Sequence, residues 1–216
     1  MLDRIESKGT EKFSPRQNAV LEEALRLLVS GGEKALTTAG VARAANCSKE
    51  SLYKWFGDRD GLMEAMISYQ ASKVRTGEGS HTHLTRESLE KALSDFAHDL
   101  LDVLSGDVSL ALNRLAIGQS SRDGSALGAM LLERGRRQID KRAMNLLVAA
   151  KRAGLLDFDE AADAYEVLYG LIVRDLHVRM LLGEDISVLR KEFGSRADKA
   201  VDAFLRLYGT RKALAD

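Results

Sequence analysis

The fold is decided by the segment from residue 38 to residue 56, which reads Thr38-Ala39-Gly40-Val41-Ala42-Arg43-Ala44-Ala45-Asn46-Cys47-Ser48-Lys49-Glu50-Ser51-Leu52-Tyr53-Lys54-Trp55-Phe56. Two helices that cross steeply need a small residue where their backbones approach, and Ala42 provides it. Four residues later the turn needs a residue that tolerates the left-handed conformation, which Asn46 does. Apolar residues then occur at the positions that hold the second helix against the first: Val41, Ala45, Cys47, Leu52 and Trp55. This spacing predicts a helix-turn-helix.

The outward face and N-terminal end of the predicted second helix carry small, polar and basic residues: Ser48, Lys49, Glu50, Ser51, Tyr53 and Lys54. In a helix-turn-helix this portion enters the major groove of DNA. Lysine can neutralise phosphate or bond to guanine, glutamate can accept from cytosine, and serine can bond to several bases. We also expect phosphate contacts from three flanking residues at neighbouring helix starts: Thr37, Thr38 and Arg59. The alternative is an ordinary helical hairpin with a solvated charged face.

The composition predicts an all-α protein. The 216 residues include 33 Leu and 27 Ala against 12 Val and 6 Ile, with a single proline, and this balance favours helices over strands. Basic and acidic residues are equal at 32 each, so binding to DNA has to come from a local patch rather than from the charge of the whole molecule.

Start and stop signals divide the chain into three parts. Ser14, Pro15 and Gln17 form a capping-box start, and the pair Gly31-Gly32 ends the helix that follows. The signals and apolar periodicity predict helices over about 14–30, 37–46, 48–57, 59–74, 89–104, 108–117, 125–152, 159–182 and 186–208. We expect a loose arm over 1–13, a DNA-binding domain over 14–75, and an effector-binding and dimerisation domain over 76–216.

The predicted helix over 159–182 is apolar around most of its circumference, more than one core face requires. One interpretation is a central helix buried within its domain. The other is that one face packs the core and the second face meets the same helix of another copy, since two-fold contacts dominate among oligomers. We favour the homodimer.

Several further functions are disfavoured by the sequence. The single cysteine, Cys47, cannot form an internal disulfide, and with no resolving partner it fits a small buried residue better than a redox sensor. His81 and His83 lack further ligands at metal spacing, so a solvated loop is favoured and we expect no metal or cofactor. No leader peptide and no apolar run of membrane-spanning length are visible, which predicts a cytoplasmic protein without a membrane partner.

The segment from Leu36 to Leu62 resembles the DNA-binding domain of TetR-family transcriptional regulators over roughly residues 14–70. The most specific match is Leu52-Tyr53, Phe56 and the basic Arg59. The resemblance implies that Tyr53 and Arg59 contact the DNA backbone, and that four residues face bases: Lys49, Glu50, Ser51 and Lys54. Asn46 replaces the usual turn glycine, and Ala39-Gly40 replace a commoner charged pair, so a less rigid second helix is expected.

Three C-terminal segments, residues 124–128, 133–137 and 176–183, resemble the AefR-like branch of the same family. The resemblance implies a dimer built on the last two long helices, a mostly apolar pocket between the middle helices, and ligand control of DNA affinity. Candidate pocket residues are Phe96, Leu100, Arg114, Met130, Met144 and His177.

The resulting prediction is a ligand-responsive repressor that binds a palindromic, double-stranded DNA operator as a homodimer and is released by a small apolar effector. No nucleophile–base pair, metal set or phosphate loop indicates an enzyme. The alternatives are a helical protein-binding adaptor and, less favoured, an all-α enzyme with dispersed residues.

Overall fold

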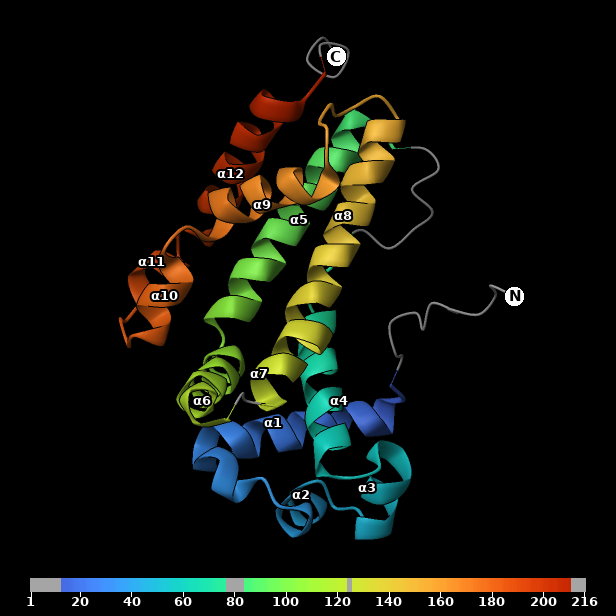
Figure 1. Cartoon of the computed structure of the whole chain (residues 1–216), viewed down its shortest axis with the longest axis vertical. Helices are drawn as coiled ribbons and strands as arrows, with labels where there is room; N and C mark the ends of the chain where they lie inside the picture. Colours follow the sequence, from blue (N-terminus) through green and yellow to red (C-terminus); the bar gives the residue numbers. More distant parts are fainter. Residues whose placement is uncertain (1–12, 77–83, 124–125, 211–216) are drawn as a thin grey trace, which may run out of the picture. The chain divides into compact units, whose positions relative to one another are not determined.

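The computed structural model describes residues 13–76, 84–123 and 126–210, so His81, His83 and most of the predicted N-terminal arm lie outside the described residues. The described residues are helical apart from loops and one isolated bridge between Leu156 and Gly209 (Figure 1). The predicted all-α class is therefore confirmed. The chain divides into two compact units, 1–72 and 73–216.

Unit 1 contains α1 (Pro15–Ala35), α2 (Thr38–Ala44), α3 (Lys49–Phe56) and α4 (Arg59–Ser72). The predicted capping box begins α1: the Ser14 hydroxyl accepts from the Gln17 backbone N–H, and the Gln17 side chain accepts from the Ser14 N–H at 2.8 Å. Gly32 has a φ of 63°, so it interrupts the helical geometry one turn before the helix ends.

The core of unit 1 lies where α1 packs against α2 and α4. One face of α1 is buried through Val20, Leu21, Ala24, Leu25 and Leu28. At the far end of α4, the Tyr69 hydroxyl donates to the Glu22 carboxylate of α1. Burial, reinforced by this carboxylate, raises the pKa of Tyr69 to about 12, so the phenol stays protonated and the link between the two helices persists at neutral pH.

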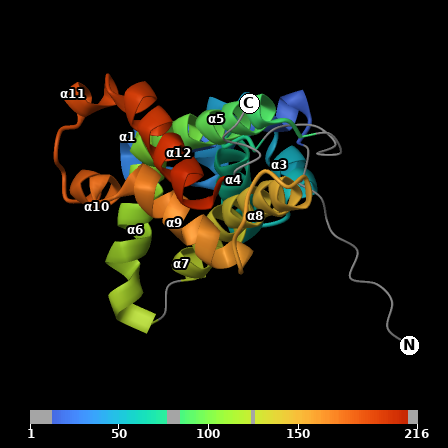
Figure 2. The same ribbon diagram turned by 90° about the horizontal axis from the view of Figure 1, so that it is seen from above.

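Unit 2 is a helical bundle. Its elements are α5 (Arg86–Ser105), α6 (Asp107–Asp123), α7 (Ala126–Met130), a π-helical segment (Leu131–Arg136), α8 (Arg137–Arg152), α9 (Ala161–Val173), α10 (Leu176–Leu181), α11 (Ser187–Arg190) and α12 (Phe193–Tyr208). α12 packs against α5 and α9, α9 also packs against α8, and α10 lies beside α6 (Figure 2). Fully buried aromatic rings fill the centre, among them Phe96, Phe193 and Phe204.

The predicted single helix over 159–182 is wrong. The chain breaks between α9 and α10 at Arg174, which has a φ of 49°, a left-handed conformation that is unusual outside glycine. The break leaves carbonyls at the end of α9 without helical partners, and the Arg196 guanidinium of α12 donates to those of Ile172 (3.0 Å) and Val173 (3.2 Å). A tertiary contact therefore stabilises a break at a position that is occupied by neither glycine nor proline.

Three other predicted elements differ in their bounds. The last helix, predicted over 186–208, is split into α11 and α12 by a turn at residues 191–192. The helix predicted over 108–117 is longer and runs from Asp107 to Asp123. The helix predicted over 125–152 is described from Ala126, and it changes to π-helical geometry for six residues, from Leu131 to Arg136.

Arginine side chains cap helix ends elsewhere in unit 2. Arg114 of α6 donates to the carbonyls of Met180 (2.6 Å) and Leu181 (3.1 Å) at the end of α10. Arg190 of α11 donates to the Ser105 carbonyl at the end of α5 at 2.8 Å. The last carbonyls of a helix lack intrahelical partners and carry partial negative charge, so a guanidinium satisfies both requirements.

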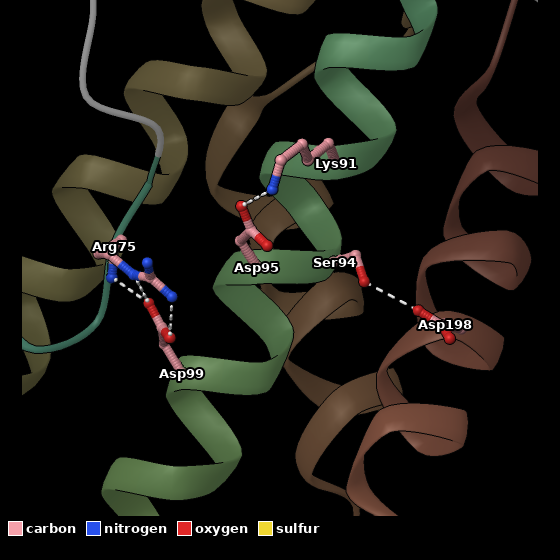
Figure 3. A network of polar contacts seen from close by, with 6 residues as sticks. All are labelled: Arg75, Lys91, Ser94, Asp95, Asp99 and Asp198. Atoms are coloured by element: carbon pink, nitrogen blue, oxygen red, sulfur yellow. Dashed lines mark hydrogen bonds and ion pairs between the residues drawn. The ribbon is translucent and has the colours of Figure 1, made fainter.

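Polar contacts also attach the first residues of unit 2 to α5 (Figure 3). The Arg75 guanidinium donates to both Asp99 oxygens, at 2.8 and 2.9 Å, and the Arg75 backbone N–H donates to the same carboxylate at 2.9 Å. Burial raises the pKa of the Asp99 carboxyl, but the hydrogen bonds and charge of Arg75 outweigh it, so this pKa lies below its usual value. On the same helix, Ser94 donates to Asp198 of α12 at 2.8 Å.

Replacing Arg196 should destabilise unit 2. Arg196→Met keeps much of the side-chain bulk but leaves the carbonyls of Ile172 and Val173 without donors, which should cost about 1–3 kcal/mol of unfolding free energy. Urea unfolding followed by circular dichroism measures this. Arg206→Met on the same helix is the control, since its ion pair with Asp202 is exposed and contributes little. Equal losses in the two variants would contradict the capping role.

Replacing Asp99 should make the free energy of unfolding less dependent on pH. A carboxyl whose pKa is lowered by folding contributes stability above its unfolded pKa, here about 3.8, and loses it as the pH falls through the lower folded pKa. Asp99→Asn should therefore be less stable than the parent at neutral pH, by less than about 1 kcal/mol because Arg75 is largely exposed, and equally stable at about pH 2. Urea titrations at both pH values test this, with Asp95→Asn as the exposed control.

Candidate DNA-binding face

The two helices of the helix-turn-helix begin at side-chain caps. The Thr37 hydroxyl accepts from the Gly40 N–H at 3.0 Å and begins α2, and the Ser48 hydroxyl accepts from the Ser51 N–H at 3.0 Å and begins α3. Ser48 and Ser51 also lie within hydrogen-bond distance of each other, 3.1 Å between their hydroxyl oxygens. Both predicted helix starts are confirmed, and their caps place hydroxyl groups at exposed helix ends.

The turn between α2 and α3 takes the predicted left-handed form at Asn46, with a φ of 48°. The Cys47 N–H donates to the Ala42 carbonyl at 2.9 Å, which closes the end of α2. Arg16 of α1 donates to the carbonyls of Ala45 (3.0 Å) and Asn46 (2.7 Å). Sequence reasoning missed Arg16, because its partners are backbone groups about thirty residues away and no local spacing signals them.

The inward face of the motif is largely as predicted. Val41, Ala45 and Leu52 are buried, and so is Ala42 at the point of close approach. Cys47 and Trp55, which were also expected to face inward, are half-buried. The Trp55 ring lies edge-on to that of Phe56, 6.2 Å between centroids. The apolar contacts therefore hold α3 mainly through Leu52 and Phe56.

The outward face of α3 is open. Lys49, Glu50, Tyr53 and Lys54 are exposed and Ser51 is half-buried; the Tyr53 residue is 56% exposed. The Ser48 side chain and the backbone of Glu50 itself hold the pKa of the Glu50 carboxyl below its usual value, so it is an ionised acceptor at neutral pH. Two cations, two hydroxyl groups and one acceptor thus share one helix face.

A sharp connection brings α4 against the end of α3. Gly57 has a φ of 78°, and a side chain at Gly61 would place its Cβ only 2.0 Å from the Phe56 carbonyl oxygen. Asp58 caps α4 by accepting from the Gly61 N–H at 2.8 Å, and Arg59 pairs with Glu33 of α1 at 2.8 Å. A surface depression here brings together three of the predicted DNA-contacting residues, Thr38, Tyr53 and Arg59, from α2, α3 and α4. The depression is lined by Leu36, Thr38, Leu52, Tyr53, Gly57, Asp58, Arg59 and Leu62.

The six candidate pocket residues lie in unit 2 but on five different helices. Phe96 and Leu100 of α5 are fully buried, Met130 of α7 and Met144 of α8 are half-buried, and Arg114 caps α10. His177 of α10 is half-buried, and its Nε2 has no hydrogen-bond partner among the described residues.

A polar cluster near the start of α8 was not predicted. Tyr165 donates to Asp140 at 2.6 Å, and the Arg136 guanidinium lies over the Tyr169 ring, 4.4 Å from its centroid. In the sequence Arg136 stands in a run of charged residues that is typical of a solvated helix face. Arg136 ends the π-helical segment, whose wider turn departs from the α-helical spacing on which a prediction from periodicity depends.

The geometry of α2, the turn and α3 defines a helix-turn-helix protein with an open second helix. Among the described residues, no helix combines the length and apolar character needed to cross a bilayer.

Comparisons with known proteins agree with this class. Residues 20–66 match the family model described as bacterial regulatory proteins of the tetR family, and residues 91–210 match that of the AefR-like transcriptional repressor C-terminal domain. The second match covers more than half of the chain. The protein belongs to the TetR family of transcriptional regulators, which are non-enzymatic DNA-binding proteins and generally respond to ligands.

Individual relatives differ in how much they cover. A TetR transcriptional regulator from Agrobacterium tumefaciens is 66% identical, with 94% of this chain and 99% of that chain covered at a TM-score of 0.79. A TetR-family regulator from Mesorhizobium loti is 22% identical, covers 90% and 97% at a TM-score of 0.68, and shows the fold alone. The HTH-type regulator YvkB of Bacillus subtilis is 33% identical over 90 residues, which span 42% of this chain and about half, 46%, of YvkB.

Replacing Asn46 by glycine should leave the stability of the protein nearly unchanged, whereas replacing it by alanine should lower it. Asn46→Gly should leave stability within about 0.5 kcal/mol of the parent, whereas Asn46→Ala should lose about 1 kcal/mol, because Cβ is disfavoured in the left-handed conformation and alanine lacks the polar side chain that favours it. Thermal unfolding of the two variants measures the difference. Arg43→Ala, an exposed change in the neighbouring helix, is the control. A glycine variant less stable than the alanine variant would contradict the role assigned to this φ angle.

Proposed function

We propose that this protein is a ligand-responsive repressor that binds a palindromic, double-stranded operator as a homodimer. The observation that carries the proposal is the exposed polar face of α3, held in place by buried contacts on its opposite side. In this proposal Lys49, Glu50, Ser51 and Lys54 read base edges, and Ser48 lies at the entry to the groove. Four residues contact the DNA backbone: Thr37, Thr38, Tyr53 and Arg59.

The ion pair between Arg59 and Glu33 bears on the backbone contacts. Both side chains are partly exposed, and an exposed pair of this kind contributes little to stability. A DNA phosphate can therefore replace Glu33 as the partner of Arg59 at small cost. In the absence of DNA, the ion pair with Glu33 holds the Arg59 guanidinium near the start of α4. This position supports the proposal that Arg59 contacts the DNA backbone.

Exposed apolar side chains support a homodimer. Val178 of α10 is 59% exposed, Leu182 directly after α10 is 82% exposed, and Leu207 of α12 is 65% exposed. The buried residues of α9, among them Leu168 and Ile172, face the core of the same chain. These exposed side chains are apolar groups that the single chain leaves uncovered, and a copy of the chain related by two-fold symmetry could cover them.

Repression is relieved in this proposal when an effector binds unit 2. Two copies of α3 must lie about 34–36 Å apart to enter successive major grooves. The effector favours an arrangement in which this distance no longer matches DNA, and it can shift the balance only by its difference in affinity between the two arrangements.

A protein-binding adaptor is the competing function, and DNA selection separates the two. The purified chain is incubated with random duplexes, and the bound fraction is sequenced. The proposal expects an inverted repeat, with affinity that falls steeply as salt rises because phosphate contacts release counterions. Recovery of no common sequence, or binding insensitive to salt, would favour the adaptor.

Removing Lys54 from the last turn of α3 should weaken DNA binding without affecting dimerisation. Lys54→Ala should lose about 1–3 kcal/mol of operator affinity, through the loss of a base or phosphate contact, while sedimentation shows an unchanged dimer. Lys141→Ala on α8, also an exposed lysine, is the matched control and should bind the operator like the parent. Loss of the dimer with intact DNA affinity would refute this division of roles.

A further inference from the structure

We propose that Arg136, Tyr169 and His177 form a recognition centre in unit 2 for a small aromatic carboxylate, which is the effector of this regulator. The inference rests on the proposed function, because it names the chemical class of the ligand to which the regulator responds. It differs from the expectation of a purely apolar effector by assigning the ligand a negative charge.

The position of Arg136 is set by the π-helical segment. Such segments are rare because their hydrogen-bond geometry is poor, and where they persist they often mark functional sites. This one, Leu131–Arg136, ends at Arg136 and directs its guanidinium onto Tyr169 of α9, at 4.4 Å from the ring centroid. A wider helical turn is thus retained at the point where a cation meets an aromatic ring.

Arg136 keeps donors for a further partner. Arg136 forms an ion pair with Asp140, but its Nε lies 3.6 Å from the carboxylate, beyond hydrogen-bond distance. The other Asp140 oxygen accepts from Tyr165 at 2.6 Å, so this carboxylate is already held by a second group. A guanidinium has five N–H donors, and its planar edge matches a carboxylate with two parallel hydrogen bonds.

His177 adds a second polar group, close enough to Arg136 for the charge of the guanidinium to act on its imidazole. Its Nε2 is buried without a hydrogen-bond partner among the described residues, an unusual state for a polar atom in a folded protein. Burial, and then the positive charge of Arg136, lower the pKa of the imidazole. At neutral pH the ring is therefore uncharged, and an Nε2–H can donate to a ligand oxygen.

The aromatic part of the ligand is inferred from the rings that continue from the cluster. Tyr169 lies 6.2 Å from Tyr165, and Tyr165 lies 6.5 Å from Phe96 in an edge-on arrangement, centroid to centroid. These rings form a row from the half-exposed Arg136 to the buried centre of unit 2. Tilted and edge-on pairs of this kind are favourable, so the half-buried Tyr169 ring can take another aromatic ring beside it.

Calorimetric titration of the full chain tests the proposal with benzoate, 4-hydroxybenzoate and phenylacetate, and with benzamide as an uncharged analogue of benzoate. We expect at least one acid to bind, and benzamide to bind at least roughly tenfold more weakly than benzoate, since it cannot form the ion pair. Nitrogen NMR of the histidine side chains should show the His177 imidazole shifting on binding of the acid. Binding of benzamide as tight as that of benzoate, or of none of the acids at millimolar concentration, would overturn the inference.

Substitutions at Arg136 and His177 test whether the acid binds at these residues. Arg136→Met and His177→Phe should each weaken binding of the acid by roughly tenfold or more, while Arg137→Met, which removes the neighbouring exposed arginine, should not. Circular dichroism and thermal unfolding check that each variant folds. If the Arg136→Met protein is folded and binds the acid as the parent does, the inference is wrong.

A DNA-binding assay separates this inference from the proposed function. Release of the selected operator by the acid supports both. Binding of the acid at Arg136 without release keeps the site and contradicts ligand control by it. Release by a neutral compound that does not displace the acid or shift the His177 signals keeps ligand control and overturns the assignment of effector class.

Discussion

The structure of the DNA-binding unit depends on a single reversal of the chain at Asn46. The left-handed conformation there turns the backbone so that α3 crosses α2 and exposes its polar face. Two carbonyls at this reversal would lack partners, and Arg16 from α1 donates to both. Buried Val41 and Leu52 then keep the two helices in contact. Asn46 thus takes the place of the usual turn glycine, and Arg16 adds two hydrogen bonds to the backbone at the turn.

The same physical solution recurs in unit 2. The last carbonyls of α5, α9 and α10 lack partners within their own helices and need donors from elsewhere. Arg114, Arg190 and Arg196 each reach across to such an end from another helix. A guanidinium suits the task because it stays charged and presents several donors in one plane. These contacts join helices that are distant in the sequence, so the bundle is held by directional bonds as well as by apolar packing.

The features of the fold that depend on residues close together in the sequence could be predicted from it. The caps at Ser14, Thr37 and Ser48 were visible in the sequence because a capping residue and its partner lie within three positions. The break at Arg174 was not visible, because Arg196, which stabilises the open end of α9, lies more than twenty residues away. The exposed face of α3 followed from helical spacing. The cluster of Arg136 and Tyr169 did not, since the π-helical segment alters the spacing on which such a prediction depends.

The two units have distinct roles in the proposed regulator: unit 1 presents α3 to DNA, and unit 2 responds to a ligand. Hydrogen exchange of backbone amides, measured on the full chain with and without the selected duplex, tests the first assignment most directly. Protection should rise at the start of α2, along α3 and at the start of α4. Protection confined to unit 2, with α3 exchanging as fast as in the free protein, would contradict it.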